Sequence, residues 1–226
     1  MIGIIAAMDA EIQEYEKKMD FVEKQKMIAD CTLIYGKWKD KDVVLCKSGV
    51  GKSAAAMSCS ILCMQEDVKV IINVGTAGGL KEDEQVLDIV ISDKVCQADF
   101  DTSPLDGPEG IGLVYNSDDS LRKLFVDASI QSGVRYHVGM VASQDLFMSR
   151  KEDYDKLLSR FPESICSEME AGAVAQVATS FKIPFVVVRS LSDVVSHEGN
   201  QMEFSTYVSK ASAQSAALID YLLQNI

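Results

Sequence analysis

Short apolar runs recur along the chain and predict buried β-strands. Four of them are rich in Val and Ile and contain few polar residues, namely Val43–Cys46, Val70–Val74, Leu87–Ile91 and Phe185–Val188. Strands without regular polar alternation need apolar cover on both faces, as in parallel or mixed sheets that carry helices on each side.

Longer segments with helical periodicity lie between and after these runs. The predicted helices are Asp9–Met19, Ser53–Gln65, Ser120–Ser132, Lys151–Arg160, Glu168–Phe181 and Phe204–Leu223. This alternation predicts an α/β fold with three layers, α/β/α, around a mixed central sheet. Because no repeat or linker interrupts the pattern, we expect a single domain over residues 1–226. The Gly/Pro/Asp-rich stretch Ala98–Ile111 is expected to be one long loop.

The charge and hydropathy of the chain argue against several classes of partner. Acidic residues number 34 against 22 Lys plus Arg, for a formal net charge of -12. A field of that sign repels nucleic acid and anionic membrane surfaces. No apolar run approaches the roughly 20 residues that span a bilayer, and the first residues lack the features of a signal peptide. We therefore expect a cytoplasmic protein.

The cysteines are expected to be reduced and buried, since they are scattered through apolar segments: Cys31, Cys46, Cys59, Cys63, Cys96 and Cys166. Cys59 and Cys63 lie one helical turn apart. A zinc site requires four ligands, however, and no second Cys/His pair accompanies them. No metal site is expected.

A first glycine-rich segment, Ser48–Ser53, follows a predicted strand and opens a predicted helix. Its Gly-Lys-Ser end resembles a phosphate-binding P-loop, but Cys46 stands where the first glycine of that motif is required, which argues against ATP or GTP hydrolysis. The segment also fits a dinucleotide fingerprint, yet the next strand ends near Asn73 and not at an acidic residue, which argues against NAD. The remaining inference is that the backbone closely approaches a ligand or another segment here.

A second glycine-rich segment, Asn73–Leu80, follows the most apolar strand. Ligand sites of open α/β sheets lie beyond such strand ends. Two interpretations remain open: a plain tight turn, or successive backbone N–H groups that face the polar edge of a small molecule.

Acid–base chemistry in this chain falls to carboxylates. The sequence contains two histidines and no Gly-x-Ser-x-Gly motif, so His-based nucleophilic triads have few possible constructions. Glu11, Glu170 and Asp193 each stand at the end of a predicted element. Any one of them could be a helix-terminal or capping acid. Together they would project toward one rim of the sheet, which predicts a shared cleft.

Five segments, in order, resemble the 5'-methylthioadenosine/S-adenosylhomocysteine nucleosidases: Gly3–Glu11, Lys47–Lys52, Ile71–Leu80, Glu168–Ala171 and Phe185–Asp193. The resemblance covers nearly the whole chain. It implies the nucleoside phosphorylase-like fold, a homodimer and no metal or organic cofactor. The implied reaction releases adenine from methylthioadenosine, S-adenosylhomocysteine and 5'-deoxyadenosine, leaving the 5'-substituted ribose.

The resemblance also implies the catalytic roles. Asp193 is similar to the family's general acid, which protonates adenine at N7, with Ser192 orienting it. Glu11 matches the residue that activates water, and Glu170 matches the carboxylate that holds the ribose hydroxyls. These residue types suit the chemistry, because an oxocarbenium-like transition state needs a proton on the departing base and water at C1'.

Further binding positions follow from the same resemblance. On the purine side they are Gly78, the backbone of Met148, and Phe147 stacked on the base, with Thr76 and Ala77 in the same glycine-rich segment. On the sugar side, Met169 is expected to lie against the ribose, and Arg189 to orient Glu170 or Glu11. The walls of the 5'-alkylthio pocket are expected to be Met8, Val50 and Phe204.

The segment Gln97–Gly107 departs from the family pattern at Ala98 and at Pro104-Leu105. In the family this loop reaches the 5' pocket of the neighbouring subunit, so the preference among 5' substituents stays open.

The sequence leaves three alternatives to the nucleosidase. An aminodeoxyfutalosine nucleosidase remains open. A purine nucleoside phosphorylase is disfavoured, because Glu11 would repel phosphate. A silent nucleoside-binding protein is disfavoured as well, because a binder has no need of a water-activating base.

Overall fold

The computed structural model describes residues 1–65, 67–194 and 200–225. Its strands are β1 Ile2–Ala6, β2 Phe21–Ile28, β3 Cys31–Trp38, β4 Lys41–Lys47, β5 Val70–Gly79, β6 Ile89–Asp101, β7 Ile111–Asn116, β8 Tyr136–Ser143, β9 Ser164–Glu168 and β10 Phe185–Val194. Its helices are α1 Asp9–Glu16, α2 Lys52–Gln65, α3 Ser103–Asp106, α4 Asp119–Ser132, α5 Lys151–Arg160, α6 Ala171–Phe181 and α7 Asn200–Asn225, with a 3-10 helix at Gly107–Gly110.

The strands form one mixed sheet in the order β10-β6-β8-β9-β5-β1-β4-β3-β2, with β7 paired to β6. The strand β10 also pairs with β5, so β5, β10, β6, β8 and β9 close into a ring. The parallel pairs β1–β5 and β5–β10 lie at the centre, where both faces are apolar. Their carboxyl ends therefore meet at one rim of the sheet.

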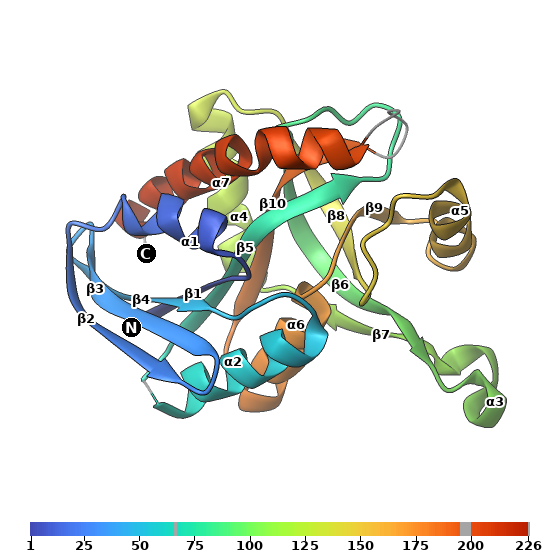
Figure 1. Cartoon of the computed structure of the whole chain (residues 1–226), viewed down its shortest axis with the longest axis horizontal. Coiled ribbons are helices and arrows are strands. Elements are labelled where there is room, and N and C mark those ends of the chain that lie inside the picture. Colours follow the sequence, from blue (N-terminus) through green and yellow to red (C-terminus); the bar gives the residue numbers. More distant parts are fainter. Residues whose placement is uncertain (66, 195–199, 226) are drawn as a thin grey trace.

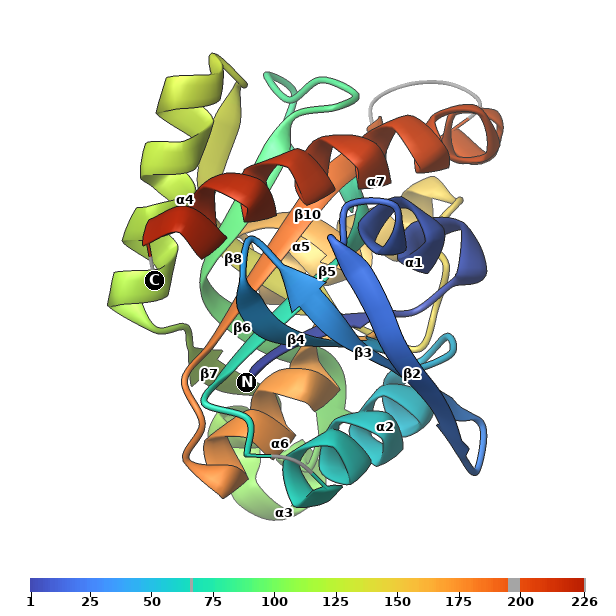
Figure 2. The same ribbon diagram turned by 90° about the vertical axis from the view of Figure 1, so that its left-hand side faces the viewer.

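Helices cover the sheet on both faces, which confirms the three-layer α/β fold with a mixed sheet (Figure 1). The helices α1, α4 and α7 pack on one face through residues such as Ile12, Phe125 and Leu222. The helices α2 and α6 pack on the other face through residues such as Leu62 and Val174. Figure 2 shows α7 crossing the sheet, with α4 at one end and α1 at the other.

The second glycine-rich segment is strand and not a turn. The strand β5 continues from Val74 through Gly79, since Gly75 pairs with Arg189, Gly78 with Asp193 and Gly79 with Val194 of β10. Pairing with β10 on one side and β9 on the other overrides the weak strand propensity of glycine. The plain-turn interpretation was therefore wrong.

Two other predicted boundaries were also wrong. The helix expected from Glu168 begins at Ala171, because Glu168 is the last residue of β9, paired with Ser143. The loop expected over Ala98–Ile111 is instead the end of the β6–β7 hairpin, in which Asp101 pairs with Ile111. Only its tip leaves the strand pattern, as α3 and the 3-10 helix, and Figure 1 shows α3 away from the helices that cover the sheet.

The cysteines lie mostly in the core and form no disulfide. Five of the six free thiols are buried, and Cys63 is partly exposed. Among the described residues, no three or more His, Cys, Asp or Glu side chains are grouped so as to hold a metal ion. Within the same residues, no helix combines the length and hydropathy that a membrane crossing requires.

Candidate active site

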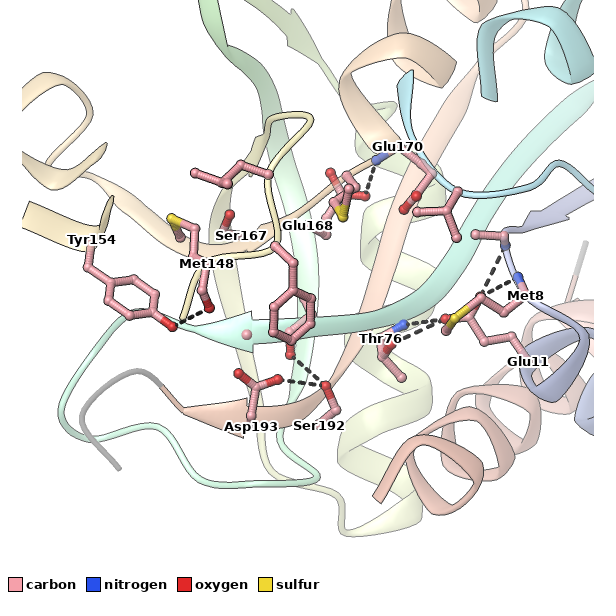
Figure 3. Close-up of a pocket in the computed structure, with 17 residues that line it drawn as sticks. Met8, Glu11, Thr76, Met148, Tyr154, Ser167, Glu168, Glu170, Ser192 and Asp193 are labelled. Atoms are coloured by element: carbon pink, nitrogen blue, oxygen red, sulfur yellow. Dashed lines mark hydrogen bonds between the residues drawn. The ribbon is translucent and has the colours of Figure 1, made fainter. Parts of the chain in front are cut away.

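A pocket opens at the rim where the central parallel strands end, and it holds about 690 Å³ of empty space including its mouth. Figure 3 shows Glu11 near one end and Asp193 near the other, with β5 running between them. The lining residues are Ala7, Met8, Glu11, Val50, Thr76, Ala77, Gly78, Leu146, Phe147, Met148, Tyr154, Ser167, Glu168, Met169, Glu170, Ser192 and Asp193. Segments far apart in the sequence therefore share one cleft.

Glu11 stands in the first turn of α1 with 3% of its surface exposed. One carboxylate oxygen accepts hydrogen bonds from the backbone N–H groups of Ala7 at 3.0 Å and Met8 at 3.1 Å. The other accepts from the backbone N–H of Thr76 at 3.0 Å and from its hydroxyl at 3.2 Å. Four donors thus hold a buried anion in one orientation.

Asp193 lies near the end of β10 and is 4% exposed. The Ser192 hydroxyl donates a hydrogen bond to Asp193 Oδ1 at 2.9 Å. The neighbouring hydroxyl therefore helps to fix the orientation of this buried carboxyl group.

Glycines in β5 make room for both carboxylates. A Cβ on Gly75 would stand 2.9 Å from Glu11 Oε1, and one on Gly78 would stand 3.1 Å from Asp193 Oδ2. Gly75 also has φ +151°, which side-chain-bearing residues rarely adopt. Thr76 and Gly78 are two residues apart on an extended strand, or roughly 7 Å. The two acids therefore approach β5 at separate points, with space between them for a ligand.

Glu170 reaches the pocket from the N-terminus of α6 and is buried. Gly51 donates its backbone N–H to Glu170 Oε1 at 2.8 Å. Burial, and next the charge of Glu168, raise the pKa of Glu170 to about 8, although Gly51 and Arg189 act in the opposite direction. Glu170 therefore keeps its proton to a higher pH than an exposed glutamate does.

Arg189 makes no hydrogen bond to Glu170 or Glu11 within the described residues. Its guanidinium instead donates to Glu168 Oε2 at 2.6 Å and to Asn73 Oδ1 at 2.6 Å, beneath the pocket. The reason is position, because Glu168 ends β9 directly below the α6 N-terminus while Glu170 turns toward Gly51.

Glu168 is a residue that the sequence reasoning missed. Its Oε2 also accepts the backbone N–H groups of Glu170 at 3.0 Å and Ala171 at 2.8 Å, and its Oε1 accepts the Ser143 hydroxyl. Glu168 thereby holds the start of α6 and with it Glu170. Glu168 ends the largely buried strand Ser164–Glu168, whereas the sequence pattern predicts it as the first residue of a helix.

Of the ten other predicted residues, nine line the pocket and one has a side chain outside the described residues. Thr76, Ala77, Gly78, Ser192, Phe147, Met148, Met169, Met8 and Val50 all line the pocket. Tyr154, which the sequence reasoning also missed, donates its hydroxyl to the Met148 carbonyl at 2.7 Å and supports that wall from α5. The side chain of Phe204 lies outside the described residues.

Comparison with known proteins places this fold and pocket in a class. The model of the phosphorylase superfamily matches residues 1–224, and the chain belongs to that superfamily. A 5'-methylthioadenosine/S-adenosylhomocysteine nucleosidase from Oceanobacillus iheyensis is 36% identical over 229 residues, which cover 100% of this chain and 99% of the relative. Within the superfamily, the chain is a member of the 5'-methylthioadenosine/S-adenosylhomocysteine nucleosidase family, as the five motifs predicted.

Two solved structures match this chain over nearly its whole length. The Neisseria meningitidis 5'-methylthioadenosine/S-adenosylhomocysteine nucleosidase in complex with methylthio-immucillin-A matches with a TM-score of 0.94 and 28% identity, over 100% of this chain and 99% of that one. The futalosine hydrolase of Helicobacter pylori matches with a TM-score of 0.93 and 25% identity, over 100% and 97% of the two chains.

The ion pair beneath the pocket generates a stability prediction. Glu168→Gln should lower the free energy of unfolding by about 3 kcal/mol, because it leaves the Arg189 charge buried without its counter-ion. Urea unfolding of the variant beside the wild type measures the loss. A difference below about 1 kcal/mol, the value typical of exposed pairs, would contradict the structural role given to this pair.

The raised pKa of Glu170 generates a pH prediction. Between the ordinary value of 4.5 and about 8, the folded protein binds more protons at this group than the unfolded chain does. Its contribution to stability is therefore present at low pH and is lost as the pH rises through about 8. Measured by urea unfolding, the free energy of unfolding should decline less between pH 5 and pH 8 in Glu170→Gln than in the wild type. The exposed Glu82→Gln is the control, and equal declines in all three proteins would contradict the prediction.

Proposed function

We propose that this chain hydrolyses the N-glycosidic bond of 5'-methylthioadenosine and S-adenosylhomocysteine, and also of 5'-deoxyadenosine, releasing adenine and the 5'-substituted ribose. The proposal takes residues 1–226 as one nucleosidase domain that acts as a homodimer in the cytoplasm, without a metal or organic cofactor. Family membership supports the reaction class, and the arrangement of the pocket carboxylates supports the mechanism.

In the proposed reaction, Asp193 gives a proton to adenine N7 while the bond between N9 and C1' breaks, and its electron pair goes to the base. Ser192 orients Asp193. A water molecule forms the new bond to C1' and passes its proton to Glu11, and Glu170 holds the ribose hydroxyls. The positions of Glu11 and Asp193 at opposite ends of the pocket support this division of roles.

The remaining pocket residues take binding roles in the proposal. Phe147 stacks on the purine, and Gly78 and the Met148 backbone bind its polar edge beside Thr76 and Ala77. Met169 lies against the ribose. Met8, Val50 and Phe204 form the 5'-alkylthio wall, and Arg189 acts indirectly, through Glu168.

The observation that carries hydrolysis over phosphorolysis is the set of four donors around Glu11. Backbone N–H groups at a helix start and at a glycine-rich strand end would otherwise suit an inorganic anion. Here the carboxylate of Glu11 already occupies them, and its charge repels a second anion. Water is thus the nucleophile that this site favours.

Adenine release from methylthioadenosine, with and without phosphate, tests the function. We expect equal rates in both buffers, with free methylthioribose as the sugar product. Strict dependence on phosphate with a sugar 1-phosphate product would overturn hydrolysis. Aminodeoxyfutalosine belongs in the same assay, because the similarity to a futalosine hydrolase favours it as a second substrate class.

The two catalytic carboxylates are tested by separate variants. Asp193→Asn and Glu11→Gln should each lower kcat at least about a hundredfold, the typical value of one proton transfer. Glu11→Ala should regain part of its activity when formate is added, because the four donors remain to bind a small carboxylate. Added chloride is the control for ionic strength, and wild-type-like turnover in either conservative variant would refute the mechanism.

A further inference from the structure

The glycine-rich turn before α2 uses its backbone N–H groups to hold carboxylates. Gly51 donates to Glu170 at 2.8 Å, and Lys52 donates its backbone N–H to Asp145 Oδ1 at 2.8 Å. The first N–H groups of a helix have no partner within the helix and favour anions. The motif that resembles a P-loop therefore binds two acidic side chains of this chain.

The side chain of Lys52, at the same turn, makes a second set of polar contacts. Its ammonium group lies 2.5 Å from Asp99 Oδ1 and 3.4 Å from Gln97 Oε1. The other Asp99 oxygen accepts the backbone N–H of Asp145 at 3.0 Å. Lys52, Asp99 and Asp145 thus form a closed triangle. The Lys52 side chain is 17% exposed, so water screens this pair less than an open surface pair.

The triangle joins the two walls of the pocket. Asp145 directly precedes Leu146, Phe147 and Met148, which form one wall. On the other side, Lys52 directly follows Gly51, whose N–H group holds Glu170. Val50, which precedes Gly51, lines the pocket. The Tyr154 hydroxyl bond to Met148, by contrast, comes from the neighbouring α5.

We propose that Lys52, together with Asp99 and Asp145, is a positioning residue that sets the separation between the purine wall and the ribose-binding carboxylate. The proposal rests on the function proposed above. Glu11 and Asp193 make none of the contacts in the triangle. Loss of the triangle therefore weakens nucleoside binding and leaves the proton transfers largely intact.

Lys52→Met tests the proposal, because it keeps the length of the side chain and removes its charge. We expect KM for methylthioadenosine to rise about tenfold while kcat stays within about twofold, the pattern of lost binding that is common to ground and transition states. Lys52→Arg should recover most of the loss, since its guanidinium can donate to Asp99. Lys69→Met is the matched control, because it removes an exposed pair with Asp67 far from the pocket.

Binding without turnover separates this proposal from the proposed function. In an Asp193→Asn background, calorimetry should give a Kd for methylthioadenosine that Lys52→Met raises about tenfold and Lys69→Met leaves unchanged. Asp145→Ala supplies an independent variant from the other side of the triangle, with the same expected rise. Equal Kd values for the Lys52 and Lys69 variants, or a loss that Lys52→Arg fails to recover, would overturn the positioning role. A wild-type protein that binds methylthioadenosine without releasing adenine would instead overturn the proposed function.

Discussion

The buried ion pair of Arg189 and Glu168 is the contact on which the arrangement of the pocket depends. It joins β10 to the end of β9, and Arg189 extends the link to Asn73 of β5. Glu168 then accepts the first backbone N–H groups of α6, so the same carboxylate fixes the position of Glu170. A buried pair is costly to desolvate unless further hydrogen bonds satisfy its atoms. Both Glu168 oxygens accept hydrogen bonds, whereas Arg189 Nε has no partner within the described residues.

Negative charge is concentrated around the pocket. Glu11, Glu168 and Glu170 stand near one buried arginine, and the repulsion among the acids contributes to the raised pKa of Glu170. Such a pocket is electrostatically suited to a sugar that becomes positively charged as its bond to the base breaks. The same negative charge disfavours phosphate. One physical cause therefore favours the positively charged sugar and disfavours an anionic nucleophile.

Backbone N–H groups at helix starts and strand ends are used throughout the site to hold carboxylates. The donors around Glu11 come from the approach to α1 and from β5, and those around Glu170 and Asp145 come from the start of α2. These are the places where other α/β proteins bind phosphates. Here the anions are the protein's own side chains, which leaves the pocket ready for a neutral nucleoside.

The apolar runs and helical periodicity determined the layered fold, and most helix boundaries followed within a few residues, because burial of one face dictates the spacing of apolar positions. The segments around Glu11, Glu170 and Asp193 were sufficient to indicate the family. Only the tertiary structure decided that Gly75–Gly79 is strand, that Glu168 ends β9, and that Arg189 pairs with Glu168. Each of these depends on a partner strand or side chain distant along the chain, and local propensity carries no information about which distant partner satisfies a buried charge or an open strand edge.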